Sequence, residues 1–373
     1  MQAALLAALT TWAESGAPDH PTAWLYRVAY NRLLQDLRRA SSRVKILSGA
    51  SGPDDAPVEL PFFANEVADD LLRMLFVCCD DAIPLQSRLV FSLKILCGFS
   101  TGEIAVRLFT TEANVHKRLA RARERLREIP FAAETPPLAR MRERLGDVHA
   151  VLYLLFNEGY LSIHPEEAVR RELCEEAIRL AMILSDHPIG AVPETFALLA
   201  LMHLHLARLS ARTDELGALL LLEEQDRSLW DQPCIARGLA WLQRSAVGDT
   251  FSRFHAEAGV AAEHCLAPSF RHTNWERIAG LYALLERTAP SPLHTLSRAL
   301  AVAEWKGPLS GLAVLDGLTP PSWLVGSYLW PAVLSDLHRR AGNKDSALAY
   351  CGNALGLAPT DAIRAALARR LSP

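Results

Sequence analysis

The sequence contains none of three short motifs that mark common catalytic and cofactor-binding frameworks: it has no P-loop, no G-x-G-x-x-G segment and no H-E-x-x-H helix. His203 and His205 stand two residues apart, whereas the paired histidines of a zinc-binding helix stand four apart on one face. We therefore expect no enzymatic activity, no cofactor and no metal site.

The chain has only seven cysteines, an odd number, and none belongs to a C-x-x-C pair. This usage favours reduced, buried thiols and argues against a disulfide framework or a zinc site. The adjacent Cys78 and Cys79 follow the apolar residues Leu75, Phe76 and Val77. We therefore expect this pair to pack in a core rather than to sense oxidants.

Long apolar runs are also absent, because none approaches the ~18–20 residues needed to cross a bilayer. The first residues lack the basic region of a secretory signal, so we expect a cytoplasmic protein with no membrane partner. The formal net charge is only −3. Residues 1–130 hold 16 Lys or Arg and 15 Asp or Glu, which is less basic than is usual for a freestanding DNA-binding protein, so we expect weak DNA binding alone and a partner that strengthens it.

The patterning that is present is helical, which predicts an all-α fold in three parts. Residues 1–39 have helical periodicity, and residues 40–65 are rich in Ser, Gly, Pro and Asp, which indicates a linker. Residues 66–130 predict a compact helical domain. After the Pro136–Pro137 pair, residues 139–373 have one helical pattern after another.

Residues 100–127 predict a helix-turn-helix. Ser100 and Glu103 fit a capping box at the start of a short helix, and a longer helix opens near Thr111. One face of the longer helix is apolar and is formed by residues at spacings of 4, 3 and 4, namely Val115, Leu119, Ala122 and Leu126. The other face carries polar and basic residues, namely Asn114, Lys117, Arg118, Arg121 and Arg125.

The charge on this second helix is one-sided, since residues 116–127 hold six Lys or Arg and one Glu. A solvated surface helix more often alternates its charges, although such a helix remains an alternative interpretation. An exposed basic helix after a short helix is typical of a major-groove reader.

Residues 22–39 predict an amphipathic helix with a second basic surface. Its polar side carries Arg27, Asn31, Arg32, Arg38 and Arg39, with Tyr26 and Tyr30 nearby. Basic and aromatic groups together suit unpaired bases. An ordinary core helix with Trp24 inside is the alternative.

Two sets of residues match, in order, the motifs of one family. The first set is Pro21, Ala23, Trp24, Leu25, Asn31, Asp36, Arg38 and Arg39. The second set is Glu103, Ile104, Ala105, Thr111, Glu112, Val115, Arg118, Leu119, Arg121, Ala122 and Arg123. With these motifs the chain resembles the extracytoplasmic-function sigma factors, the sigma-70-family subunits that direct bacterial RNA polymerase to promoters.

The C-terminal part is similar to one subgroup of that family, on the evidence of residues 148–162 and Leu173–Leu180. In that subgroup a long helical extension of the tetratricopeptide (TPR) type follows region 4. Three pairs stand 34 residues apart, the TPR period: Leu300 and Leu334, Ala301 and Ser335, and Ala313 and Ala347. The concave face of such an α-solenoid suits a regulatory protein partner.

The resemblance implies recognition rather than chemistry, with core RNA polymerase and promoter DNA as partners. Region 4 would read the upstream (−35) element through Arg107, Asn114, Lys117, Arg118, Arg121 and Arg125, with Lys117 or Arg121 on guanine edges and Arg107 and Arg118 on phosphates. Region 2 would face the downstream (−10) element through Arg27, Asn31, Arg32, Arg38 and Arg39.

Region 2 matches the family only from the middle of its polymerase-gripping helix, so an N-terminally truncated region 2 is expected within residues 1–39. The polymerase contacts would be Gln2, Leu5, Leu6 and Leu9.

Two other functions remain open on the sequence alone. One is a helix-turn-helix regulator that works without polymerase, and the other is an α-solenoid scaffold whose sigma-like part has decayed. In the extension, Asn157 and Glu158 are the best candidate polar site. Their alternative is a helix C-cap, in which Gly159 adopts a left-handed turn and Asn157 bonds locally.

Overall fold

The computed structural model describes Gly16 and residues 74–128, 138–162, 168–215 and 217–371. The chain divides into two compact units, Met1–Arg73 and Met74–Pro373, and the fold described below is that of the second. Its described residues are helical, with a single isolated β-bridge between Thr213 and Leu219. The predicted all-α class is confirmed. None of the described helices is long and apolar enough to cross a membrane.

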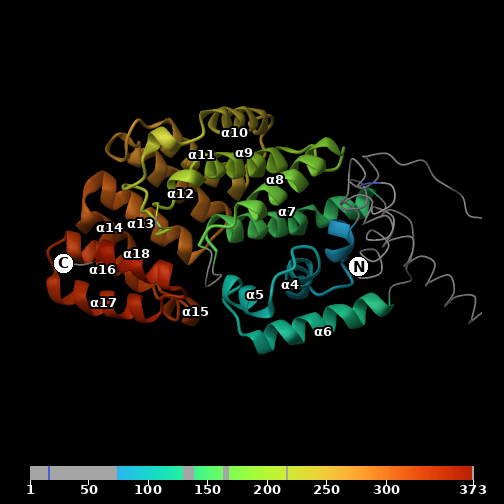
Figure 1. The fold of residues 1–373 in the computed structure, drawn as a ribbon, viewed down its shortest axis with the longest axis horizontal. Helices are drawn as coiled ribbons and strands as arrows, with labels where there is room; N and C mark the ends of the chain where they lie inside the picture. Colours follow the sequence, from blue (N-terminus) through green and yellow to red (C-terminus); the bar gives the residue numbers. More distant parts are fainter. Residues whose placement is uncertain (1–15, 17–73, 129–137, 163–167, 216, 372–373) are drawn as a thin grey trace, which may run out of the picture. The chain divides into compact units, whose positions relative to one another are not determined.

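The helix-turn-helix is built from α4 (Leu85–Ile95), α5 (Thr101–Arg107) and α6 (Glu112–Glu128), with α6 packed on both other helices (Figure 1). The predicted capping box is present, because the Ser100 hydroxyl accepts the Glu103 amide at 3.1 Å and the Glu103 carboxylate accepts the Ser100 amide. Between α5 and α6 the chain turns at Phe109, whose φ of 50° lies in the left-handed region.

The apolar seam of α6 faces the module's core as predicted, since Val115, Leu119 and Ala122 are buried. The Leu126 side chain lies outside the described part. Ile104 of α5 and Leu93 of α4 are both fully buried in the same module. The 4-3-4 spacing therefore did identify the inner face of the helix.

The extension begins with α7 (Leu138–Tyr160), α8 (Arg171–Asp186), α9 (Pro193–Leu206) and α10 (Gln232–Ser245). Ten consecutive residues of α9, Thr195–Leu204, are buried, and the helix packs on α7, α8, α10 and α11 (Arg253–Leu266). A helix that is apolar on every side has to be enclosed by its neighbours, which explains why α9 lies at the centre of this part.

The extension continues through α12 (Trp275–Thr288), α13 (Pro292–Lys306), α14 (Pro308–Leu315), α15 (Ser322–Val325), α16 (Leu329–Arg340), α17 (Lys344–Gly356) and α18 (Asp361–Leu371). Three short 3₁₀ helices, η1 (Leu209–Ala211), η2 (Arg227–Leu229) and η3 (Phe270–His272), stand between the earlier helices. Most consecutive α-helices pack on one another.

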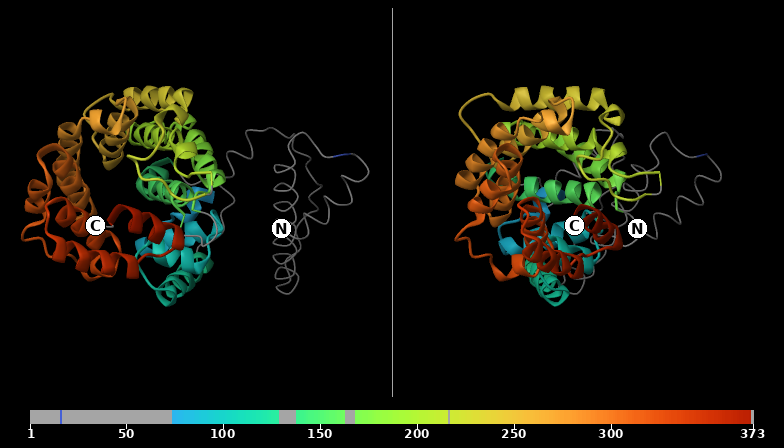
Figure 2. Two further views of the ribbon diagram at one scale, coloured as in Figure 1. Left: turned by 60° about the vertical axis from the view of Figure 1, so that its left-hand side comes forward. Right: turned by 90° about the vertical axis from the view of Figure 1, so that its left-hand side faces the viewer.

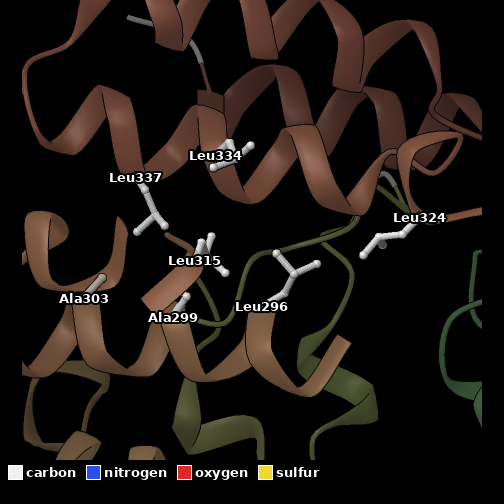
Figure 3. Close-up of a cluster of buried hydrophobic side chains, with 7 residues drawn as sticks. All are labelled: Leu296, Ala299, Ala303, Leu315, Leu324, Leu334 and Leu337. Atoms are coloured by element: carbon white, nitrogen blue, oxygen red, sulfur yellow. The ribbon is translucent and has the colours of Figure 1, made fainter. Parts of the chain in front are cut away.

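The core between α13, α14 and α16 shows how these helices approach closely. Leu296, Ala299, Ala303, Leu315, Leu324, Leu334 and Leu337 form one buried cluster (Figure 3). A Cβ on Gly311 would lie 2.7 Å from the Ala299 carbonyl oxygen and from the Ala303 Cβ, so only glycine allows this contact. In the next helix pair, the Ser335 hydroxyl donates to the Ala347 carbonyl at 2.9 Å.

Helices α7 to α18 follow an arc that returns to the helix-turn-helix (Figure 2). At the closure the Phe109 ring stands 4.9 Å from the Trp323 ring, centroid to centroid. Residues 74–128 and the extension therefore form one compact body rather than two separate modules.

Candidate nucleic-acid interface

The outer face of α6 is open to solvent. His116, Lys117, Arg121, Arg123 and Arg125 are exposed. Asn114 and Arg118 are half-buried beside the turn. Charged groups in this position keep their hydration and remain available to an incoming polyanion.

The basic groups at the middle of this face are not committed to other parts of the protein. Within the described residues no hydrogen bond or ion pair occupies the side chains of Lys117, Arg118 or Arg121. Guanidinium and ammonium groups are the donors that phosphates and guanine edges accept. The arrangement can therefore bind DNA without breaking an internal contact at these three positions.

The start of α6 is fixed by side-chain hydrogen bonds to the preceding turn and helix. The Asn114 amide nitrogen donates to the Thr110 hydroxyl at 2.8 Å. The Thr101 hydroxyl of α5 donates to the Glu112 carboxylate at 3.0 Å. Asn114 therefore has one of its two amide N–H donors engaged, and the second N–H can still donate to a base.

Arg107 lies in a different environment from the α6 side chains. At the end of α5, its Nε donates to the Glu158 carboxylate at 3.0 Å, its Nη2 forms an ion pair with the same group, and Nη2 also donates to the Leu161 carbonyl at 2.8 Å. Because α5 faces α7 here, the guanidinium points to the extension and not to the surface of α6. A phosphate contact from Arg107 requires this ion pair to break.

The predicted C-cap at Asn157–Gly159 is wrong, because α7 continues through these residues to Tyr160. Gly159 has no left-handed backbone. It is instead a point of close approach, where a Cβ would lie 2.7 Å from the Arg170 carbonyl oxygen, the Cys174 amide nitrogen and the Cys174 Sγ. The Glu158 side chain is fully buried and accepts a 2.7 Å hydrogen bond from Ser162 as well as the contacts from Arg107.

Two further contacts tie α5 and the turn to the extension. Arg170 pairs with Glu103 at 3.2 Å, so the carboxylate that caps α5 also holds the segment before α8. The Phe109–Trp323 contact supplies the second. With the Arg107–Glu158 pair, these contacts hold the first helix of the helix-turn-helix and leave the second helix uncovered.

The other side of the helix-turn-helix is anchored through α7. The Arg144 side chain is buried, donates to the Phe76 carbonyl at 3.1 Å and pairs with Asp80 at 2.6 Å. Arg88 of α4 pairs with Asp147 at 2.6 Å. Because both arginines are largely buried and partnered, they connect α7 to the helix-turn-helix and do not serve as ligand-binding groups.

Gly98, Ser100 and Gly102 have the G-x-S-x-G spacing of a hydrolase nucleophile elbow. Such an elbow joins a strand to a helix, whereas this segment joins α4 to α5. The Ser100 hydroxyl serves the capping box. The segment is therefore a helix start and carries no nucleophile.

Cys78 and Cys79 are buried, which confirms their predicted packing role. Burial raises the pKa of each thiol to about 12, so neither is a reactive thiolate at neutral pH. In the described ranges no group of three or more His, Cys, Asp or Glu side chains is arranged to hold a metal ion.

The predicted region 2 residues lie outside the described residues. These are the downstream-element residues Arg27, Asn31, Arg32, Arg38 and Arg39, and the polymerase-contacting residues Gln2, Leu5, Leu6 and Leu9. The linker predicted at 40–65 lies outside them as well.

Comparison with known proteins defines the class of this site. Residues 74–126 match the family described as sigma-70, region 4, so the helix-turn-helix is a region 4 DNA-binding domain of the sigma-70 type. That family contains transcription factors rather than enzymes. Residues 144–246 match a second family, described as a family of unknown function (DUF6596).

Over nearly its whole length the chain is similar to an uncharacterized protein of Rhizobium meliloti (strain 1021). The two are 35% identical over 377 residues, covering 99% of this chain and 87% of that protein. The chain therefore belongs to the same family as the Rhizobium protein. No solved structure matches it.

Proposed function

We propose that this protein is an extracytoplasmic-function sigma factor that directs bacterial RNA polymerase to a specific set of promoters. The observation that carries the proposal is the open basic face of α6 within a region 4 domain. Three of its cations, Lys117, Arg118 and Arg121, have no internal partner among the described residues. The resemblance of residues 17–39 to region 2 adds the expectation of a second, downstream contact.

In this proposal α6 enters the major groove of the upstream promoter element. Lys117 and Arg121 are exposed near the middle of the helix and read base edges. Arg118 lies closer to the protein and holds a phosphate, as does Arg125. Asn114 contributes the amide N–H that its bond to Thr110 leaves free.

The extension, which we propose to be TPR-like and regulatory, controls how α5 and α6 meet DNA and polymerase. Three contacts support this role: Arg107–Glu158, Glu103–Arg170 and Phe109–Trp323. All three hold α5 or the turn, and none covers α6. The extension therefore sets the orientation of region 4 and keeps Arg107 away from DNA until their contact opens.

The proposal is tested by run-off transcription with core polymerase and a promoter selected from random DNA by the polymerase–protein complex. Lys117→Ala and Arg121→Ala should each weaken promoter use by the equivalent of about 1–3 kcal/mol and relax the preference at one base pair. Arg142→Ala on α7, an exposed arginine outside α6, is the matched control and should transcribe normally.

Two results would overturn the sigma-factor assignment. The first is failure of the full chain to co-purify with core polymerase. The second is native transcription by the Lys117→Ala/Arg121→Ala double variant. Selective DNA binding without any effect of polymerase would instead support a regulator that acts alone.

A further inference from the structure

A cavity of about 740 Å³ is lined by residues of the helical extension and of the helix-turn-helix. Its walls come from α7, α9, α11, α12 and α13, and from residues 106–109 of the helix-turn-helix. Cavities of roughly 300–1,000 Å³ with mostly apolar walls and a few polar groups are typical of small-molecule sites. The volume is too large for a single inorganic ion.

One polar group in this wall has no partner of its own. Arg208 follows α9, is 6% exposed and lines the cavity. Its Nε is buried without a hydrogen-bond acceptor, and within the described residues no carboxylate or carbonyl bonds the guanidinium. The guanidinium instead makes a cation–π contact with the Trp230 ring, with Cζ 5.2 Å from the ring centroid. A buried guanidinium that lacks a counter-charge is unusual in a folded protein.

The neighbours of Arg208 add donors and positive charge instead of compensating it. The Cζ atom of Arg227 also lies over the Trp230 ring, 4.7 Å from its centroid. Its Nη1 donates to the carbonyls of His264 and Ala267, and its Nη2 has no partner. Arg212 lies 3.9 Å over the Tyr160 ring with an unpartnered Nε. In the described parts of the chain none of these three arginines forms a salt bridge.

Two histidines complete the cluster. His205 and His264 line the cavity, and the Nδ1 atom of each is buried without a partner. Burial, followed by the nearby arginines, lowers the pKa of His264 to about 3 and that of His205 well below its usual value. Both are therefore neutral at physiological pH because a further positive charge is disfavoured here.

Another charged pair on the same wall provides a contrast. Arg253 and Glu257 also line the cavity, but they neutralise each other through a 3.1 Å ion pair. Positive charge without compensation is thus confined to the Arg208 side. The remaining wall near it is apolar and aromatic, for example Val260, Leu285 and Tyr282.

We propose that this cavity binds a small organic acid, whose anionic head group pairs with Arg208 and accepts a hydrogen bond from His264, and whose apolar body lies against Val260 and Leu285. An anion supplies the missing counter-charge and accepts from the unpartnered donors. An apolar body matches the rest of the wall. The proposal does not depend on the sigma-factor assignment, since its test needs neither polymerase nor DNA.

The test is a fluorescence titration of the full chain with 8-anilinonaphthalene-1-sulfonate, an aromatic anion, followed by competition. Octanoate and octylamine serve as competitors because they share a tail and differ in the charge of the head group. We expect octanoate to displace the probe at a concentration at least about tenfold lower than octylamine, a ratio typical of one charge-assisted hydrogen bond. Equal displacement by the two compounds would overturn the proposal without any variant being needed.

Variants locate the site. Arg208→Gln and His264→Gln should weaken probe and octanoate binding, the former by about tenfold or more. Arg244→Gln is the matched control, because Arg244 also lies over an aromatic ring, that of Phe196, but is exposed and outside the cavity. Arg208→Lys keeps the charge and should retain part of the affinity if Arg208→Gln fails to fold. Native affinity in Arg208→Lys, Arg208→Gln and His264→Gln alike would place binding elsewhere and overturn the assignment.

Discussion

The molecule contains two basic clusters that the same residue types build in opposite surroundings. On α6, Lys117 and Arg121 stand in water, where charge carries little desolvation penalty. In the extension, Arg208 is buried and Arg227 half-buried beside the Trp230 ring, and a buried charge without a counter-charge is strongly disfavoured. The comparison teaches that a count of arginines says little until the position of each relative to solvent and acids is known.

A third arginine, Arg107, shows that arginines away from solvent differ in whether an acid neutralises them. Arg107 is enclosed but bonded to Glu158, whereas Arg208 is enclosed and has no acid. Burial alone therefore does not indicate a ligand site. A ligand site is indicated by burial without a counter-charge. The largest predicted effect distinguishes an arginine that has an acidic partner from one that has none.

The largest expected effect is on Arg107. Arg107→Met should lower the free energy of unfolding by about 3 kcal/mol, because it removes the cationic partner of the fully buried Glu158 carboxylate. Arg208→Met should leave that free energy unchanged or raise it by about 1 kcal/mol, because it removes a charge that no acid compensates. Urea unfolding followed by circular dichroism measures both variants. Equal losses in the two would remove the distinction between partnered and unpartnered arginines.

The second effect is on pH dependence, through His264 in the buried cluster. Its pKa is lowered by burial and by Arg208 and Arg227 to about 3 when folded, against 6.5 when unfolded. The unfolded chain therefore binds a proton that the folded chain refuses, and stability is lost as pH falls from about 6.5 towards 3. The slope contributed is about 1.4 kcal/mol per pH unit. His264→Gln should flatten the stability profile in this range, as measured by urea unfolding at a series of pH values.

The third effect concerns the close approach of α7 to the start of α8 at Gly159, next to the buried Glu158. Gly159→Ala should destabilise the protein by about 1–3 kcal/mol, because its Cβ would meet the backbone of Arg170 and Cys174. Gly146→Ala in the same helix meets nothing within 4 Å and should stabilise by about 0.5–1 kcal/mol. Thermal unfolding of the pair checks the result, and a shift of the same sign in both would contradict it.

The smallest effect is expected on the open face. Lys117→Ala and Arg121→Ala should change the free energy of unfolding by less than about 0.5 kcal/mol, because both side chains are exposed and unpaired in the described structure. Removing Arg118, for which we propose a phosphate contact, should reduce the salt dependence of DNA binding by about one unit of slope. A large loss of stability in either exposed variant would mean that α6 has a structural role in place of a recognition role.

The all-α class, the capping box at Ser100 and the inner face of α6 were predictable from the sequence, since each depends on residues within one or two helical turns. Local periodicity was enough to separate Val115 and Leu119 from Lys117 and Arg121. The start of α6 at Glu112 also agrees with the expected opening near Thr111.

What the sequence did not predict depends on partners far along the chain. Arg107 meets Glu158, 51 residues away, and Glu103 meets Arg170, 67 residues away. Likewise, the wall that joins Arg208 to Arg227 and His264 exists only after several helices have packed. Local spacing suggested a C-cap at Gly159, and the packing of α8 against α7 decided otherwise.

The contact between Phe109 and Trp323 has a consequence for how the protein is made. The region 4 match ends at residue 126, so the ribosome adds Trp323 197 residues after that domain is complete. During that interval the turn before α6 lacks its aromatic contact with the extension, so a nascent or prematurely terminated chain has a helix-turn-helix whose turn Trp323 does not hold.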